Sequence, residues 1–460
     1  MARDPEALAT GRARRATRAT TALAPSTVRF ASSLAASLVR SPERAAEILE
    51  RRHEEIADNA LEVLGGLRGG AMKLGQLASF VDIEFVPPEY RAIYQEKLAG
   101  LRDAAPPMSW NKVRRVLEGE WDEPLESLFE DFEHEARAAA SIGQVHRAVL
   151  PGGRAVAVKV QYPEIADAVA SDLDFAALGI RLAKAFAPGL DPRAVAGELR
   201  ERIMEELDYE LEAQHQRFFA RTYRGHPFAY VPEVVTELSR RRVLVSDWVD
   251  GRPFAEATRL PEPERDRIGE VIYRFYFGSM QRLRRYNTDA HPGNYLLLDD
   301  GRMAFLDFGS VKVVTREWLE AGGRVMGAAM DGDVEEHHRA IEAMGYFHRA
   351  DRVDREWLMR QTVATFQWLR RDEEFRIDPD YVARVVAAMI DASPEGIRMA
   401  RSIKVPPEEI FFRRMSVGVV AVLGQLRASA NWHRLAREHI FGDEPRTELG
   451  HAEAAFFGRG

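Results

Sequence analysis

The chain has 460 residues, of which 46% are hydrophobic, so it is long enough to bury the cores of two lobes and an extension. It contains no cysteine, which excludes disulfides, thiolate metal sites and cysteine nucleophiles and fits a reducing compartment. A net charge of −8 and a pI near 5.9 argue against nonspecific binding to nucleic acid.

Residues 1–25 predict a flexible basic tail. Five arginines stand there among alanine and threonine, without the apolar core of a secretory signal. A solvated tail is the simpler interpretation, and a membrane-surface segment is the alternative. Since no run of about 18 apolar residues occurs in the chain, we expect no membrane-spanning helix. The expected location is the cytoplasm, with peripheral contact to the inner face of a membrane as a further hypothesis.

Residues 26–125 predict a helical extension. Apolar residues recur at helical spacing between positions 26 and 70, and Ser41-Pro42-Glu43 is typical of a helix start. The pattern K-x-G-Q follows, in which Lys73 and Gln76 would share one helix face around Gly75. Taken by themselves, a lysine and a glutamine on one face are ordinary surface residues.

Residues 126–250 predict a β-rich lobe. Two apolar runs around Pro151-Gly152-Gly153 indicate a hairpin, and V-A-V-K places Lys159 on a strand whose other face is buried. A segment of small residues precedes this strand and would let the backbone approach a phosphate closely. Alanine does not adopt positive φ freely, so this segment should be stiffer than a glycine-rich loop. It comprises Ala138, Ala139, Ala140, Ser141, Ile142 and Gly143.

Helical segments are expected at 167–187 and 192–223, and the second carries E-E-L-D-Y-E-L-E-A. Acidic residues in such a helix usually form a solvated face. The apolar run that begins at Arg241 predicts a buried strand that ends in a hinge between two lobes. The backbone near Asp247 and Val249 is where an adenine ring would bind.

The segment from Asp289 to Gly309 contains the most informative pattern. Asp-Asp-Gly between two apolar runs predicts a tight hairpin, which would return Asp307 to the side of Asp289 and Asn294. Two carboxylates and a carboxamide in one small volume suit a magnesium ion that bridges nucleotide phosphates. Asp289 and Asn294 are five residues apart, as in the catalytic loop of protein kinases, and Asp307-Phe308-Gly309 matches the metal-binding triplet that follows it.

The chain resembles the ABC1 family of atypical kinases, also called UbiB, ADCK or AarF-type, in five motifs. These are D-x-H-P-G-N, K-x-G-Q, A-A-A-S-I-G-Q-V, V-A-V-K and E-x-D. The resemblance covers roughly residues 65–430. It implies an α+β, helix-rich, two-lobed protein-kinase-like fold whose N-terminal helical extension packs over the active site. The expected N-lobe is 126–250 and the helical C-lobe is 251–442, followed by a tail at 443–460.

The resemblance also implies roles for particular side chains. Lys159, paired with Glu206 of E-x-D, would hold the α- and β-phosphates of ATP or ADP. Asn294 and Asp307 would bind Mg²⁺, and Asp289 would serve as base or orienting carboxylate. The remaining motif residues would form a gate over the catalytic centre, with Glu212 against Lys73: Lys73, Gly75, Gln76 and Glu212.

The sequence also suggests positions for several other polar residues. His291 is expected to brace the catalytic loop. Either Arg413 or Arg414 would lie near Lys73. Three histidines lack ligand spacing and are expected on the surface: His337, His338 and His348.

No A-P-E motif or long activation loop follows Gly309, which leaves no obvious docking place for a protein substrate. By the resemblance, we expect ATP hydrolysis or phosphorylation of a small or lipid-like molecule, such as a quinone precursor in isoprenoid-quinone or lipid metabolism. The alternatives are a nucleotide-binding regulatory scaffold with little turnover and a small-molecule kinase of the aminoglycoside or choline type. The oligomeric state stays open, with a dimer as one option.

Overall fold

A computed structural model describes residues 108–140, 142–163, 207–389, 393–400 and 402–458. The chain divides into two compact units, and the larger unit comprises Ser109–Gln161 together with Gly179–Gly460. All the helices and strands discussed below belong to this larger unit. They confirm the mixed α and β character that the sequence predicts.

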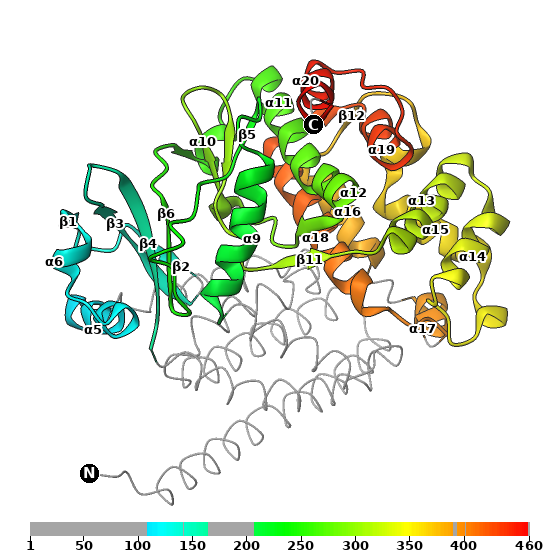
Figure 1. Ribbon diagram of the computed structural model, residues 1–460. Helices are drawn as coiled ribbons and strands as arrows, with labels where there is room; N and C mark the ends of the chain where they lie inside the picture. The colour runs from blue at the N-terminus through cyan, green and yellow to red at the C-terminus, as the bar shows by residue number, and fades with distance from the viewer. Residues whose placement is uncertain (1–107, 141, 164–206, 390–392, 401, 459–460) are drawn as a thin grey trace, which may run out of the picture. The chain divides into compact units, whose positions relative to one another are not determined.

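The first sheet is antiparallel and has the strand order β1-β3-β4-β6, with β2 paired to β3. The hairpin between β3 and β4 turns at Gly152 and Gly153, whose φ values of +94° and +83° are readily adopted only by glycine. The predicted Pro-Gly-Gly turn is therefore confirmed. Helices α5 (Trp110–Trp121) and α6 (Leu125–Leu128) precede the sheet in the chain (Figure 1). The strands are β1 (Asp131–Phe132), β2 (Ala138–Ala140), β3 (Gly143–Val149), β4 (Ala155–Gln161) and β6 (Val243–Asp247).

A second sheet carries the other predicted hairpin. Its order is β5-β10-β9-β7, and β9 pairs with β10 in the register Met303↔Leu297. Gly301 lies in the connecting turn with φ +81°, which confirms the hairpin predicted from Asp-Asp-Gly. A separate strand pair, β8 with β11, lies on either side of this hairpin in the chain. The bounds are β5 (Ala229–Tyr230), β7 (Arg252–Pro253), β8 (Arg285–Asn287), β9 (Tyr295–Leu297), β10 (Met303–Phe305) and β11 (Val311–Val313).

Helix α9 (Tyr209–Thr222) begins after Leu207 and Asp208, which are not helical. The sequence predicts one continuous helix through this region, and this is wrong at Asp208. The Asp208 carboxylate accepts hydrogen bonds from the backbone N–H groups of Glu210 and Leu211, so it is the N-cap of α9. An N-cap residue has extended backbone geometry, so a helix cannot run through it.

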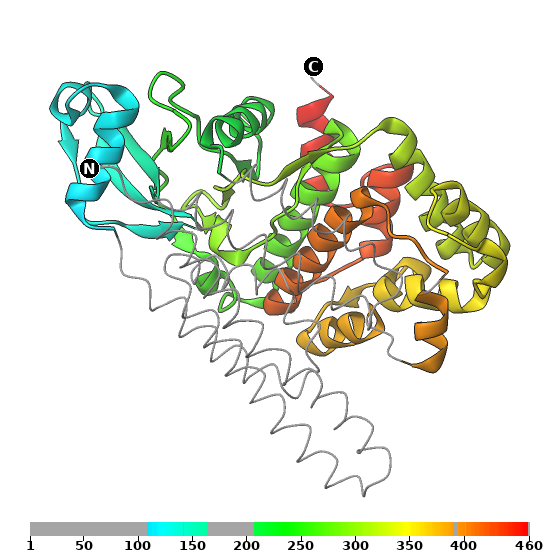
Figure 2. The same cartoon turned by 90° about the horizontal axis from the view of Figure 1, so that it is seen from below.

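The helices after the first sheet form the larger part of this unit. α11 packs along α18, and both views show the two helices next to each other (Figures 1 and 2). A π-helical turn joins α11 to α12. The helices are α10 (Phe254–Ala257), α11 (Glu262–Tyr273), the π-helical turn (Arg274–Gly278), α12 (Ser279–Leu283), α13 (Arg316–Asp331), α14 (Val334–Ala343), α15 (Arg355–Thr365), α16 (Pro379–Met389), α17 (Pro394–Ala400), α18 (Pro407–Leu426), α19 (Trp432–Phe441) and α20 (Glu448–Phe457). A short strand pair, β12 (Phe375–Arg376) with β13 (Ser429–Ala430), lies among them.

An aromatic core connects α9 to the hairpin. The Phe308 ring, fully buried, packs on Phe219 of α9 with ring centroids 5.0 Å apart. Phe275 stacks on Phe305 of β10 at 3.6 Å. These contacts hold the residues that flank Asp307 against the helix that carries Glu212, because buried aromatic rings contribute large apolar areas.

The C-terminal region differs from the prediction. Residues 443–460 are expected to form a tail, but Glu448–Phe457 form α20, and the Glu453 side chain is fully buried. Glu453 holds the helix in place through an ion pair with the buried Arg274, a tertiary contact that the local sequence does not indicate. Among the described residues, no helix combines the length and apolar character needed to cross a bilayer.

Candidate nucleotide and magnesium site

Lys159 lies on the partly exposed face of β4. Its neighbours Val156, Val158 and Val160 are fully buried, as the alternation of a half-buried strand requires. β4 is the strand between β3 and β6, and Lys159 stands opposite Val145 and Leu244. The lysine is thus fixed at its base by pairing on both sides.

The Lys159 ammonium pairs with Glu212 in the first turn of α9. Its Nζ donates to Glu212 Oε1 at 2.8 Å and to Oε2 at 3.0 Å. The ammonium also lies 4.9 Å from the centre of the Tyr209 ring. This contact corrects the predicted role of Glu212, which pairs with Lys159 where the sequence analysis expected Glu206. Glu206 itself lies outside the described residues.

The reason for this correction is the helix start. The Asp208 cap begins α9 just before Tyr209, so Glu212 falls one turn into the helix, on the face that meets β4. Both E-x-D residues precede the helix, and the Asp208 carboxylate is occupied by the cap. The sequence offered one signal, the six-residue spacing between Glu206 and Glu212, but spacing alone does not show which residue begins the helix.

The hairpin brings Asp307 to the same ammonium. Lys159 Nζ lies 3.3 Å from Asp307 Oδ2, and Asp307 Oδ1 accepts from the backbone N–H of Gly309 at 2.9 Å. The backbone N–H of Leu306 donates to the Asn294 carbonyl at 3.0 Å. The bond between Leu306 and Asn294 is the approach that the predicted hairpin requires, and the contact of Asp307 with Lys159 joins residues 148 apart in the sequence.

Asn287, which the sequence reasoning did not single out, ties the loop that carries Asp289 to Asp307. Its Nδ2 donates to the Asp307 carbonyl at 2.6 Å, and its Oδ1 accepts from the Asp289 backbone N–H at 2.8 Å. The side chain is buried at the end of β8. The available sequence signal was a polar residue two positions before Asp289, the aspartate predicted to be catalytic.

Both oxygens of Asp289 have partners. Arg414 Nη2 on α18 donates to Asp289 Oδ1 at 2.8 Å, and Asn294 Nδ2 donates to Oδ2 at 3.1 Å. Arg413 instead pairs with Glu409 at 2.7 Å, so of the two arginines left open by the sequence it is Arg414 that reaches the site. Its relation to Lys73 lies outside the described residues.

The charges around Lys159 do not balance. Burial lowers the pKa of the Lys159 ammonium, but Asp307 and Glu212 outweigh burial and raise the pKa well above its ordinary value. Burial raises the pKa of Glu212 to about 7; Lys159 opposes this rise and Asp307 adds to it. One ammonium therefore faces two carboxylates, and the site carries one negative charge in excess at high pH.

This excess charge fits a divalent cation. Asp307 is partly exposed, and Asn294 donates through Nδ2, which leaves its carboxamide oxygen as a ligand atom. Oxygen donors of this kind, few in number and partly open to solvent, suit Mg²⁺, which keeps several waters and binds substrate phosphates. Asp307 and Asn294 are the residues that would hold such an ion.

The small-residue segment forms a strand next to the site. Ala138, Ala139 and Ala140 form β2 and pair with β3; Ser141 lies outside the described residues. Ile142 is buried. A Cβ on Gly143 would lie 2.1 Å from the Val160 carbonyl oxygen, so only glycine allows β3 to start this close to β4.

The segment predicted as a hinge begins where β6 ends, at Asp247. The Asp247 backbone N–H donates to the Glu233 carbonyl at 2.9 Å, and its side chain accepts from Arg154 Nε at 2.7 Å. Val249 is half-buried just beyond the strand. Their predicted contacts with adenine remain a proposal. The predicted gate residues Lys73, Gly75 and Gln76 lie outside the described residues.

The histidine predictions are corrected in part. His291 caps the 3-10 turn Pro292–Asn294 by accepting from the Gly293 backbone N–H at 3.0 Å, which gives it a bracing position. His348 is exposed as predicted. His337 and His338 are buried, contrary to prediction, because they lie on the inward face of α14: His337 bonds to Thr362 and His338 stacks on Phe347.

A hollow of about 690 Å³ lies elsewhere in this unit, between α12, α13 and α19. Arginines and carboxylates line it in a mixture, and none of the residues discussed above contributes to it. We place the candidate site at Lys159, where charged groups from several elements converge, and not in this hollow.

Comparisons with known proteins identify the family of this chain. Residues 100–340 match the family described as "ABC1 atypical kinase-like domain". "Atypical kinase coq-8, mitochondrial" of Caenorhabditis elegans is 28% identical over 411 residues, which cover 85% of this chain and 52% of the relative. "Atypical kinase COQ8B, mitochondrial" of Danio rerio is 32% identical over 285 residues, with 61% and 44% covered. "Protein ACTIVITY OF BC1 COMPLEX KINASE 1, chloroplastic" of Arabidopsis thaliana is 33% identical over 285 residues, with 59% and 40% covered.

The chain thus spans about half the length of these curated relatives. A solved structure covers it more fully. Rv3197 from Mycobacterium tuberculosis, in complex with erythromycin, is 34% identical, with a TM-score of 0.61 over 86% of this chain and 98% of that one. The likeness confirms the α+β kinase-like fold. Since the family match spans more than half of the 460 residues, the chain belongs to the ABC1 family of atypical kinase-like proteins.

Proposed function

We propose that the protein binds Mg-ATP or Mg-ADP and acts as an ATPase or phosphotransferase. The single observation that carries this proposal is the position of the Lys159 ammonium, 2.8 Å from Glu212 and 3.3 Å from Asp307. A strand lysine, a helical glutamate and the aspartate of D-F-G meet in this way where protein kinases hold nucleotide phosphates.

Each residue would have a defined task. Lys159 would contact the α- and β-phosphates, with its amine oriented by Glu212. Asp307 and Asn294 would hold the Mg²⁺ ion, which supplies charge neutralisation between the phosphates when bound. The stiff backbone of Ala138–Gly143 would cover the phosphates. Asp289 would accept or orient the proton of the attacking group.

Asp289 also supports a second candidate. A carboxylate whose two oxygens both accept hydrogen bonds, from Arg414 and Asn294, has reduced capacity to take a proton from a substrate. Turnover would then require Arg414 or Asn294 to move away. A protein that remains in this arrangement would bind nucleotide with little turnover, as a regulatory scaffold.

The substrate class follows from the family and from its relatives. We propose a small or lipid-like acceptor, such as a quinone precursor, rather than a protein. Rv3197, the relative whose structure is solved, is in complex with erythromycin, a small molecule and not a protein. A small-molecule kinase of the aminoglycoside or choline type remains the alternative. Action in quinone or lipid metabolism, a cytoplasmic location and contact with a membrane surface all belong to this proposal.

The test is phosphate release from ATP by the wild type and by Asp289→Asn. Reactions would contain Mg²⁺ or a chelator and would be run with detergent and phenolic quinone mimics, with erythromycin, and with an aminoglycoside and choline panel. The proposal expects Mg²⁺-dependent release that Asp289→Asn reduces at least about tenfold. Nucleotide binding without release in either protein would favour the scaffold, and absence of nucleotide binding would refute both.

The motif residues of the N-terminal extension complete the proposal. Lys73, Gly75 and Gln76 would form a gate over the phosphates, which leaves an ATPase coupled to conformational change as credible as a kinase. Liposome flotation with anionic vesicles tests the membrane contact. No flotation by the full chain would remove that part of the proposal without affecting nucleotide binding.

A further inference from the structure

The π-helical turn at Arg274–Gly278 connects two distant parts of this unit. Tyr276 donates its hydroxyl hydrogen to the Asp289 carbonyl at 3.1 Å and accepts from the Tyr295 hydroxyl at 2.9 Å. Arg274, two residues earlier, points to the C-terminal helices. Wide turns of this kind are rare in helices and frequent at functional sites.

Arg274 is a fully buried arginine with partners on three helices. Its Nε donates to Glu270 at 2.7 Å, its two Nη atoms donate to Glu438 at 2.7 and 2.8 Å, and Nη1 donates to Glu453 at 3.0 Å. Thr447, the N-cap of α20, accepts from Nη2 at 3.0 Å. Buried charges arranged in this way are worth little as a pair, but loss of one partner leaves the others uncompensated.

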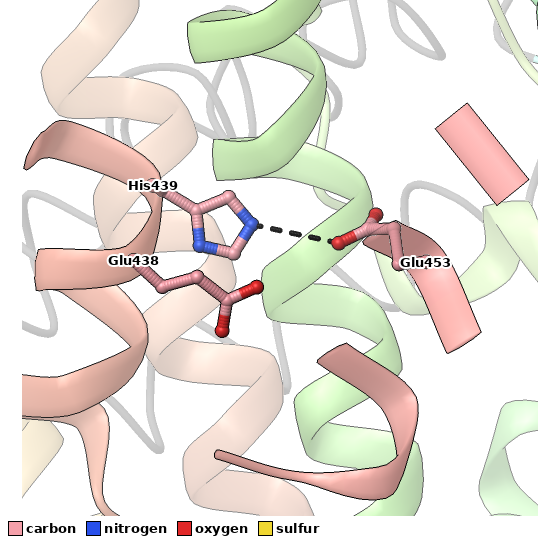
Figure 3. A group of neighbouring side chains, drawn as sticks. All are labelled: Glu438, His439 and Glu453. Atoms are coloured by element: carbon pink, nitrogen blue, oxygen red, sulfur yellow. Dashed lines mark ion pairs between the residues drawn. The ribbon is translucent and has the colours of Figure 1, made fainter. Parts of the chain in front are cut away.

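The donor types of Glu438, His439 and Glu453 would also suit a metal ion (Figure 3). His439 Nδ1 bonds to the Leu435 carbonyl, and its Nε2 faces Glu453 at 3.8 Å. The position between the two glutamates, however, is filled by Arg274 Nη1, which lies 2.7 Å from one and 3.0 Å from the other. The Arg274 guanidinium therefore occupies the place that a metal ion would take between the two glutamates, and it links α20 to α19 and to the π-helical turn.

Helix α20 also packs against the end of α9. Phe457 meets Tyr223 edge to face at 6.0 Å, and Phe456 meets His226 at 4.8 Å. Arg282 of α12 lies over the Phe457 ring at 4.4 Å and 3.2 Å from Glu453. One short helix thus touches both the helix that carries the Lys159 partner and the turn that supports the catalytic loop.

We propose that α20 is a C-terminal clasp that positions the catalytic loop and α9, with Glu453 and Arg274 as positioning residues. When Glu453 holds Arg274, the π-helical turn is fixed, and Tyr276 keeps the Asp289 carbonyl in place. The aromatic rings of α20 also hold the end of α9. The consequence for nucleotide binding depends on the proposed function; the positioning itself does not.

The first experiment measures amide hydrogen exchange in the full chain. Glu453→Gln keeps the shape of the side chain and removes its charge, and Glu448→Gln is the matched control because Glu448 is exposed on the same helix. The clasp predicts at least about threefold faster exchange in 288–295 and in α9 for Glu453→Gln only. Faster exchange confined to α19 and α20 would overturn the proposal.

The second experiment is a double-mutant cycle of Glu453→Gln with Tyr276→Phe, read by Mg-ATP affinity and by urea unfolding. Distant, independent residues are additive in both readouts. The clasp predicts that the two changes together weaken affinity at least about threefold less than the product of the single effects, and that their effects on the free energy of unfolding are likewise less than additive. Additive affinity effects would refute the coupling.

Two controls keep the outcomes separate. Should Glu453→Gln fail to fold, Tyr276→Phe leaves the arginine cluster intact and must by itself raise exchange in 288–295; unchanged exchange there would overturn the proposal. If the wild type binds no Mg-ATP, the proposed function fails, but hydrogen exchange still tests the clasp.

Discussion

The Glu212 carboxylate should lower the free energy of unfolding at neutral pH and strengthen nucleotide binding. It is 3% exposed and shares the Lys159 ammonium with Asp307. Burial raises its pKa from 4.5 to about 7. Glu212→Gln keeps a hydrogen-bonding group beside Lys159 and removes the titration, so this variant isolates the effect of the charge.

The direction in which stability changes with pH follows from the protons that Glu212 binds in the folded and unfolded states. Between pH 4.5 and about 7 the folded protein keeps a proton on Glu212 that the unfolded chain has released, so the stability from this group is full below pH 4.5 and is lost as the pH rises through 7. Each pKa unit is worth about 1.4 kcal/mol, which makes the loss about 3 kcal/mol. Relative to wild type, Glu212→Gln should gain about that much free energy of unfolding between pH 4.5 and 8.

Urea unfolding followed by tryptophan fluorescence at pH 4.5, 6 and 8 measures this gain. Glu210→Gln is the matched control, because it makes the same substitution at an exposed position in the same first turn of α9. At pH 8 the Glu212→Gln protein should also bind Mg-ATP more weakly, since an amide orients Lys159 less firmly than a carboxylate. A stability difference that stays constant from pH 4.5 to 8 would refute the assigned burial of the Glu212 charge.

Three further changes test other parts of the site. Lys159→Met should weaken ATP binding at least about tenfold in calorimetry and should destabilise most at high pH, where two carboxylates face each other; equal affinity would contradict its role. Asp307→Asn should leave ATP affinity independent of Mg²⁺, and a retained Mg²⁺ response would count against it. Gly143→Ala should cost about 3 kcal/mol or more through its clash with Val160, whereas Gly119→Ala, with open space around it, should cost nothing.

The placement of Asp307 beside Asn294 and the orientation of Lys159 on its strand could be predicted from the sequence because both depend on local geometry. Asp-Asp-Gly specifies a two-stranded return whatever surrounds it, and this return alone brings Asp307 beside Asn294. The alternation of V-A-V-K likewise orients Lys159 within its own strand. Such features depend on residues less than about 20 positions apart.

Only the tertiary structure decided three features: the partner of Lys159, the arginine at Asp289 and the clasp at Arg274. Glu212 is selected by where Asp208 starts α9, Arg414 reaches Asp289 from a helix 125 residues later, and Glu453 meets Arg274 across 179 residues. A lone acidic residue in a helix looks the same whether it is solvated or buried. Its burial depends on which distant helix packs against it, and that is set by the whole core rather than by neighbouring residues.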